Sequence, residues 1–134
     1  MADLALRLDP QMPPVKLGYL VNAYFFGRKF ERTIDLYDQL PEENRSWGTR
    51  FPRAASAAFL GRVEDAERAK ADLVAKNGEQ VMEIYVNEGW VFARTNEQDL
   101  LREAFRKLGF RICATEEELN KFDRPKRLPE CVKS

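Results

Sequence analysis

The stretch Ala23-Tyr24-Phe25-Phe26-Gly27-Arg28 returns 34 residues later as Ala57-Ala58-Phe59-Leu60-Gly61-Arg62. Self-similarity at a fixed spacing is typical of proteins built from stacked supersecondary units. The pairs Asp9-Pro10, Glu43-Asn44 and Asn77-Gly78 keep the same spacing, and each of them can end a helix. Both the repeated stretch and the helix-ending pairs recur every 34 residues, and this shared period predicts a chain of repeated helical units.

Between these positions the apolar residues follow helical spacing, and no window shows the sustained alternation of a half-buried strand. A capping box at Thr115 to Glu118 predicts a further short helix through Leu119 and Phe122. The longer predicted helices span residues 14–26, 29–41, 48–60, 62–76, 79–94 and 97–108.

Apolar stripes on two of these helices predict which faces meet the core. Small side chains on the third helix would let two helix axes approach closely, as a hairpin requires. The stripes consist of Phe30, Ile34, Tyr37 and Leu40, and of Val63, Ala66, Leu73 and Val74; the small residues are Ala54, Ala55, Ala57 and Ala58.

The composition fits one helical domain without obvious catalytic chemistry. Of the 134 residues, 44% are hydrophobic and 33% are charged, which indicates amphipathic helices with solvated outer faces. Twenty-two basic residues balance 22 acidic ones, so no positive field attracts nucleic acid. Histidine, the commonest general base and metal ligand, is absent. We therefore expect no enzymatic activity, no cofactor, no metal and no nucleic-acid partner.

The cysteines and the N-terminus predict a cytoplasmic protein. Cys113 and Cys131 are too far apart for a metal knuckle or a Cys-x-x-Cys pair, and two thiols in a chain of this length do not indicate a disulfide scaffold. We expect Cys131 to be an inert thiol. Residues 1–14 lack the basic segment followed by an apolar segment that is typical of a signal peptide. No apolar run approaches the ~20 residues that are needed to cross a bilayer.

The residues resemble the tetratricopeptide repeat (TPR) pattern, which also has a 34-residue period. In that pattern apolar and small residues and a Tyr mark the first helix of each hairpin, and Ala and an aromatic residue mark the second. The resemblance implies an all-α fold, a right-handed α-α superhelix of helix hairpins with about six or seven helices. The first unit matches at Leu17, Leu20, Val21, Tyr24, Thr33, Tyr37 and Leu40, and the second at Ala54 and Ala66, with Ala57 and Lys70 in place of the aromatics.

The pattern also predicts how the chain is organised. The start of the chain resembles the last turn of the second helix of a hairpin whose first helix is missing. This would be expected if a longer array were truncated at residue 1. Terminal units of such arrays are atypical because one face meets water. The predicted segments are this last turn in 1–12, TPR-like units in 13–44 and 45–78, a degenerate capping helix pair in 79–110, and a short helix with an extended tail in 111–134.

The tail itself offers no clear recognition motif. Arg124-Pro125 and Leu128-Pro129 forbid a continuous helix and favour extended backbone. The basic residues Arg124, Lys126 and Arg127 are too few for a nucleic-acid tail, so we expect them to be solvated.

A narrower likeness concerns the parent protein. Arg7-Leu8-Asp9-Pro10 with Pro13-Pro14, and Leu100-Leu101-Arg102 with Arg106-Lys107-Leu108-Gly109, are similar to C-terminal repeat regions of bacterial adenylate/guanylate cyclase-like regulators. This likeness implies a regulatory region of a longer signalling protein. It does not imply cyclase activity, because nothing here matches the paired Asp of a cyclase catalytic domain.

The resemblance implies a non-catalytic module that binds a protein or peptide segment, including a segment of its own parent chain, and it leaves self-association open. Such arrays dock peptides on the concave face lined by the first helix of each hairpin. The candidate contact residues are Asn22, Phe25, Phe26, Arg50 and Arg53. Burial in the core is the competing interpretation for the two Phe side chains.

A second hypothesis is a small-molecule sensor or a small enzyme with an internal cavity. Tyr85, Glu88 and Arg94 would supply the polar groups on an otherwise apolar helix.

Overall fold

The computed structural model describes residues 13–88 and 95–132 of the chain, and all of its regular structure in these ranges is helical. Seven α-helices and two short 3-10 helices are present there, with no β-strand and one isolated parallel bridge between Val81 and Arg111. The predicted all-α fold with six or seven helices is confirmed. The predicted last turn in 1–12 and part of the predicted helix 79–94 lie outside the described residues.

The chain divides into two compact units, with unit 1 ending at Asn77 and unit 2 beginning at Gly78. Within the two described ranges, every helix falls short of the length and apolarity that a membrane crossing requires. The elements of unit 1 are α2 (Pro14–Phe26), α3 (Phe30–Gln39), η1 (Glu42–Asn44), α4 (Trp47–Phe59) and α5 (Val63–Asn77). Those of unit 2 are α6 (Met82–Asn87), α7 (Thr95–Leu108), α8 (Glu116–Leu119) and η2 (Pro129–Cys131).

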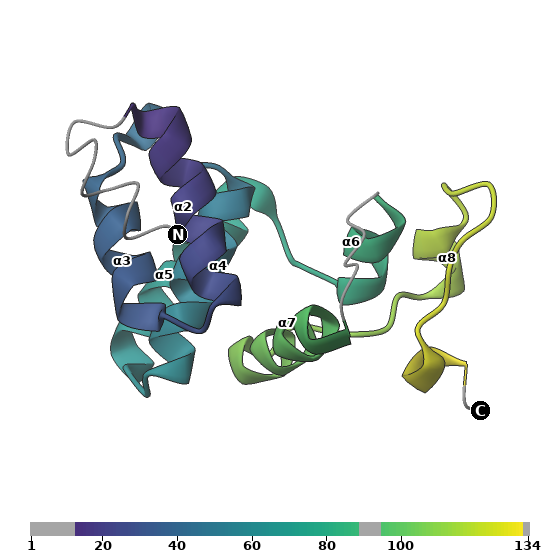
Figure 1. Ribbon diagram of the computed structural model, residues 1–134. Coiled ribbons are helices and arrows are strands. Elements are labelled where there is room, and N and C mark those ends of the chain that lie inside the picture. Colours follow the sequence, from purple (N-terminus) through teal and green to yellow (C-terminus); the bar gives the residue numbers. More distant parts are fainter. Residues whose placement is uncertain (1–12, 89–94, 133–134) are drawn as a thin grey trace. The chain divides into compact units, whose positions relative to one another are not determined.

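Unit 1 consists of two successive helix hairpins, α2 with α3 and α4 with α5 (Figure 1). Helix α4 packs against both α2 and α3, so the first helix of the second hairpin contacts both helices of the first hairpin. Ala54, Ala55 and Ala57 have no exposed surface, and their small side chains allow this close approach of α4.

The two hairpins turn in the same way. In the first, the N–H of Lys29 donates to the carbonyl of Tyr24 (2.8 Å); in the second, the N–H of Arg62 donates to that of Ala57 (3.0 Å). These bonds close a Schellman turn, which needs one left-handed residue just after the helix. That residue is Arg28 (φ 60°) in the first turn and Gly61 (φ 74°) in the second.

The structural period is therefore one residue shorter than the sequence similarity suggests. The left-handed residues lie 61 − 28 = 33 positions apart, and α4 begins 47 − 14 = 33 positions after α2. Matching Gly27 with Gly61 is wrong by one position, because Gly27 has φ −83° and is not the left-handed residue of its turn.

Most of the residues that match the TPR pattern in the first repeat unit lie together in one core cluster. Val21, Tyr24, Tyr37 and Leu40 are buried together with Leu36. The partly buried Leu17 and Leu20 pack against the same cluster. The residues that carry the resemblance are thus the residues that join α2 to α3.

Two details of unit 1 differ from the prediction. Helix α3 ends at Gln39, because Pro41 forces Leu40 into extended backbone (ψ 134°). The expectation that Val63 and Val74 face the core is wrong, since their side chains are 65% and 37% exposed. Only one narrow side of α5 is buried, the line through Ala66 and Leu73.

In unit 2 the start of α6 is held by another part of the chain. The N–H groups of Met82 and Glu83 donate to the carbonyls of Arg111 (3.1 Å) and Ile112 (3.0 Å). These bonds satisfy donors that the first turn of a helix leaves unpaired, and α6 therefore begins three residues later than predicted.

Helix α8 has the predicted start. The N–H of Glu118 donates to Oγ1 of Thr115 (3.1 Å), and the N–H of Thr115 donates to Oε1 of Glu118 (2.9 Å), so the predicted capping box is confirmed. The helix ends at Leu119, and Phe122 lies beyond it against the cluster of Val81, Ala114 and Leu119.

Cys113 and Cys131 form a disulfide with their Cα atoms 5.4 Å apart. The expectation of an inert, unpaired thiol at Cys131 is wrong. Beyond α8 the chain turns back along α6, where Asn87 pairs with the backbone of Lys126 through two hydrogen bonds (2.7 and 2.9 Å). This return brings position 131 beside position 113, which their separation in sequence does not reveal.

Candidate binding site

A hollow of about 240 Å³ lies in unit 1 between α3, η1, α4 and α5. Four Arg and four acidic side chains surround it, and we call it the arginine basin. Its lining consists of Tyr37, Asp38, Glu42, Arg45, Arg50, Arg53, Asp65, Arg68, Ala69 and Asp72.

Arg50 on α4 is the most deeply placed cation of the basin, with a side chain that is 9% exposed. Its Nη1 donates to Oδ1 of Asn77 (3.1 Å), and its Nη2 donates to Oε1 of Glu42 (3.4 Å). Its Nε lies 3.6 Å from Oδ2 of Asp72 and makes no hydrogen bond. A buried donor without an acceptor is costly, so this N–H favours an acceptor that enters the basin.

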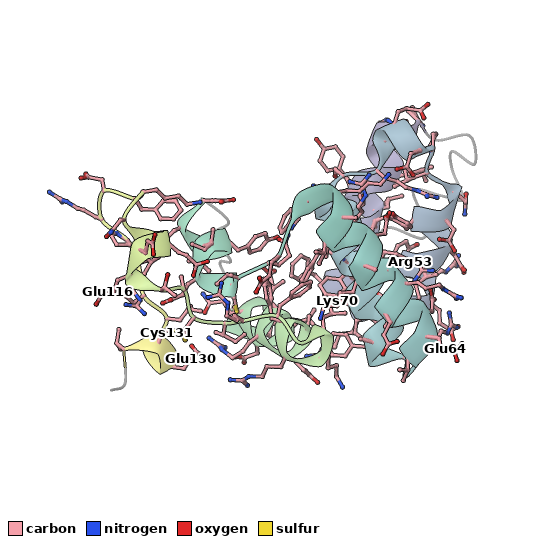
Figure 2. All side chains as sticks on the ribbon, turned by 180° about the vertical axis from the view of Figure 1, so that it is seen from behind. Arg53, Glu64, Lys70, Glu116, Glu130 and Cys131 are labelled. Carbon is pink, nitrogen blue, oxygen red and sulfur yellow. A yellow bond between two sulfur atoms is a disulfide. The ribbon has the colours of Figure 1, made fainter. Side chains whose placement is uncertain are left out.

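Arg53, one turn further along α4, forms hydrogen bonds to both α3 and α5 (labelled in Figure 2). Its Nη1 and Nη2 donate to the two carboxylate oxygens of Asp65 on α5 (3.1 and 3.0 Å), and its Nε donates to Asp38 on α3 (3.3 Å). The bidentate geometry orients the guanidinium and ties the two hairpins together on this side.

Arg45 and Arg68 complete the cationic lining. The guanidinium of Arg45 lies over the ring of Tyr37, 4.6 Å from its centre, and its buried Nε has no hydrogen-bond partner. Burial raises the pKa of Tyr37, so its phenol stays neutral at physiological pH. Arg68 projects from α5 into the lining and is exposed.

The acidic groups of the basin sit nearer to water than its deep cations. The side chains of Glu42 and Asp72 are 56% and 47% exposed. The hydrogen bond and the charge of Lys76 (2.6 Å) hold the pKa of Glu42 below its ordinary value. The charges of Arg50 and Arg45 lower this pKa further, and partial desolvation acts in the opposite direction. The basin thus combines fixed guanidinium groups with carboxylates that can move into solvent. Its chemistry suits the binding of carboxylate groups.

The structure brings two of the five predicted contact residues together in this basin, Arg50 and Arg53. Phe25 is fully buried, with its ring 6.5 Å from that of Phe51, and Phe26 is partly buried beside it. Nδ2 of Asn22 donates to the carbonyl of Gly48 (2.9 Å) and so joins α2 to the first turn of α4. These three residues lie outside the lining of the basin.

The residues proposed to line an internal cavity, Tyr85, Glu88 and Arg94, are not shown to share one site. The ring of Tyr85 packs near Phe105, and burial raises the pKa of this Tyr. Glu88 is exposed at the end of α6, with its carboxylate 3.7 Å from Nζ of Lys121. Arg94 lies outside the described residues.

Sequence reasoning missed the part of the basin that α5 contributes. Asp65, Arg68 and Asp72 follow one another at spacings of three and four, which places them on one side of a helix. That spacing, next to the buried Ala66 and Leu73, was the available signal. Arg45 carries no comparable signal, since it lies between η1 and α4.

No family model, no curated protein and no solved structure matches this chain. The inference of function therefore starts from the hairpins and the arginine basin.

Proposed function

We propose that this chain is a non-catalytic interaction module of the TPR type, and that its arginine basin binds an acidic segment of a protein chain. Such a module suits a regulatory region of a larger bacterial signalling protein, in which the bound segment can belong to the same polypeptide. The observation that carries the proposal is the buried Nε of Arg50, a residue of the basin lining, which makes no hydrogen bond.

The hairpins support the class of protein. Two hairpins with the same Schellman turn follow one another, and the second packs on both helices of the first. Repeat arrays are built by such nearest-neighbour packing, and their stacking creates extended surfaces for recognition. The basin lies where α3 of one hairpin meets α4 and α5 of the next.

The charges support an acidic partner even though the basin is formally neutral. An incoming carboxylate can replace Glu42 or Asp72 at the guanidinium of Arg50, and the displaced carboxylate moves into water at little cost because it is already half exposed. The cation cannot move in the same way, since Arg50 is anchored to Asn77. Hydrogen bonds between guanidinium and carboxylate groups are among the stronger ones in proteins.

The test is a selection of random displayed heptapeptides on the immobilised chain, in parallel with the Arg68→Gln and Arg45→Gln variants. We expect enrichment of peptides that contain Asp or Glu. Synthetic copies of these peptides should bind each variant at least tenfold more weakly than the unchanged chain, and their Gln-substituted forms should not bind.

The matched control is Arg62→Gln, which removes an exposed Arg that directly precedes α5 and does not line the basin. Circular dichroism verifies the fold of every variant. Enrichment of peptides without acidic residues, or acidic peptides that bind all three variants equally, would contradict the proposal. An unenriched selection would contradict it as well.

A further inference from the structure

Unit 2 holds a cluster of three potential metal ligands that the proposed function does not use. The ligand atoms of Glu83, Cys113 and Cys131 all lie within 4.8 Å of one another. Glu83 is fully buried on α6, and both cysteines are partly buried. Figure 2 labels Cys131 and the neighbouring Glu130 at η2.

Contacts other than the disulfide hold the two cysteine-bearing segments in place. Oε1 of Glu83 accepts the N–H of Ala114 (2.8 Å), and its Oε2 accepts the N–H of Leu128 (2.9 Å). Arg102 on α7 forms a bidentate pair with Glu130, next to Cys131. One buried carboxylate and one ion pair thus fix the chain beside both cysteines, and opening of the S–S bond would leave the two sulfur atoms close together.

The charge of the cluster suits a divalent cation. Two thiolates and the Glu83 carboxylate carry three negative charges, and the guanidinium of Arg127, which donates to Oε2 of Glu83 (2.9 Å), cancels one of them. A carboxylate offers about four lone-pair positions, and the three hydrogen bonds to Glu83 leave one on Oε1. Thiolates select soft or borderline ions such as Zn²⁺.

We infer that the reduced form of this chain binds one Zn²⁺ ion through Sγ of Cys113, Sγ of Cys131 and Oε1 of Glu83, with water in the fourth position. A tetrahedral ion with Zn–S bonds of ~2.3 Å places two sulfur atoms ~3.8 Å apart. The two sulfur atoms are bonded in the disulfide form and must move apart to reach this distance once the S–S bond opens. The ligand atoms of all three residues lie within 4.8 Å of one another, so only a small rearrangement is needed. The disulfide form has no thiolate to offer, so oxidation and metal binding exclude each other.

The chemical step needs a dithiol reductant. The S–S bond between Cys113 and Cys131 takes up two electrons and two protons, and the dithiol becomes a disulfide. Zn²⁺ then displaces the two thiol protons into solvent as the two Zn–S bonds form.

The experiment uses the full chain, reduced with a dithiol that is then removed by anaerobic gel filtration, and titrated with Co²⁺ as a spectroscopic substitute for Zn²⁺. We expect one Co²⁺ per chain, with thiolate-to-cobalt charge-transfer bands in the near ultraviolet and intense visible bands of tetrahedral cobalt. Zn²⁺ should displace it stoichiometrically. X-ray absorption of the zinc form should show two sulfur neighbours at ~2.3 Å and oxygen neighbours at ~2.0 Å.

Variants separate this site from nonspecific binding. Cys113→Ser and Cys131→Ser should each weaken Co²⁺ binding at least tenfold, and Glu117→Gln, an exposed charge on α8, should leave it unchanged. Cobalt binding by the oxidised chain or by the Cys→Ser variants at the level of the reduced chain would overturn the inference. So would a reduced chain that binds no cobalt, or one that loses its helical circular dichroism when the disulfide opens.

Discussion

Arg28 and Gly61 occupy the same left-handed position in two turns of identical hydrogen bonding, 33 residues apart. A side chain at such a position carries a steric cost that glycine avoids. Unit 1 therefore tolerates this cost in its first hairpin and avoids it in its second.

Replacement of Gly61 by Ala should lower the free energy of unfolding by about 1 kcal/mol. Apart from the two adjacent residues, no atom lies within 4 Å of the added Cβ, so the backbone conformation alone causes the loss. Gly48→Ala is the matched control, because its Cβ would meet only Oγ of Ser46 at 3.7 Å inside α4, where Ala is favoured. Urea unfolding followed by circular dichroism measures both. Equal effects of the two changes would contradict the assignment of the turn.

Arg53→Lys should destabilise the chain by about 1 kcal/mol, because an ammonium group cannot reproduce the bidentate pair with Asp65. Arg62→Lys is the comparison, since the exposed pair of Arg62 with Glu31 at 3.4 Å should contribute almost nothing. Chemical denaturation of both variants under one buffer condition gives the difference. If Arg53→Lys had no effect, this contact between the hairpins would not contribute to stability.

Glu83→Gln should destabilise unit 2 by about 3 kcal/mol. The amide loses the charge that Arg127 pairs with, and its NH2 group would face the backbone N–H of either Ala114 or Leu128. Hydrogen exchange read at the amides of Ala114 and Leu128 should accelerate, because both of these N–H groups donate to Glu83. Unchanged protection at these two amides would show that the carboxylate is not their acceptor in solution. Glu117→Gln serves as the charge-matched control.

Acid should remove the contribution of the pair between Glu118 and Arg111. The hydrogen bonds from the Arg111 guanidinium, helped by the backbone N–H of Thr115, lower the pKa of Glu118 from 4.5 to about 2. A carboxylate with a depressed folded-state pKa stabilises the fold above its unfolded pKa and loses this effect as protons bind to the folded form. The difference in Tm between the unchanged chain and Glu118→Gln should therefore be constant above about pH 5 and shrink between pH 4.5 and pH 2. Thermal unfolding at four pH values measures it, and a difference that grew toward pH 2 would contradict the assignment.

Local rules of the sequence were enough to predict the helices. The bounds of α2 match the prediction, and those of α3, α4, α5 and α7 differ from it by one or two residues. Apolar spacing reports which face of a helix is buried, and the capping box of α8 is a purely local motif. Helix α6 starts late because distant carbonyl groups, those of Arg111 and Ile112, accept its first N–H groups.

The candidate sites depend on contacts between distant residues, and sequence reasoning found them only in part. Arg50 and Arg53 were predicted from their place on the first helix of a hairpin, but their partners on α3 and α5 follow from packing. The burial of Glu83 had no signal at all, because a Glu near the start of a helix is ordinarily exposed. Arg127 is exposed as expected, but its pairing with the buried carboxylate of Glu83 was not predicted.

While the disulfide is formed, tension applied at Val132 passes from Cys131 directly to Cys113, and the residues between them carry no load. The seventeen residues 114–130 are bypassed in this way, which hides about 60 Å of extended chain from a stretching measurement. The cystine therefore makes the end of unit 2 mechanically short, and its reduction would lengthen the stretched molecule by that amount.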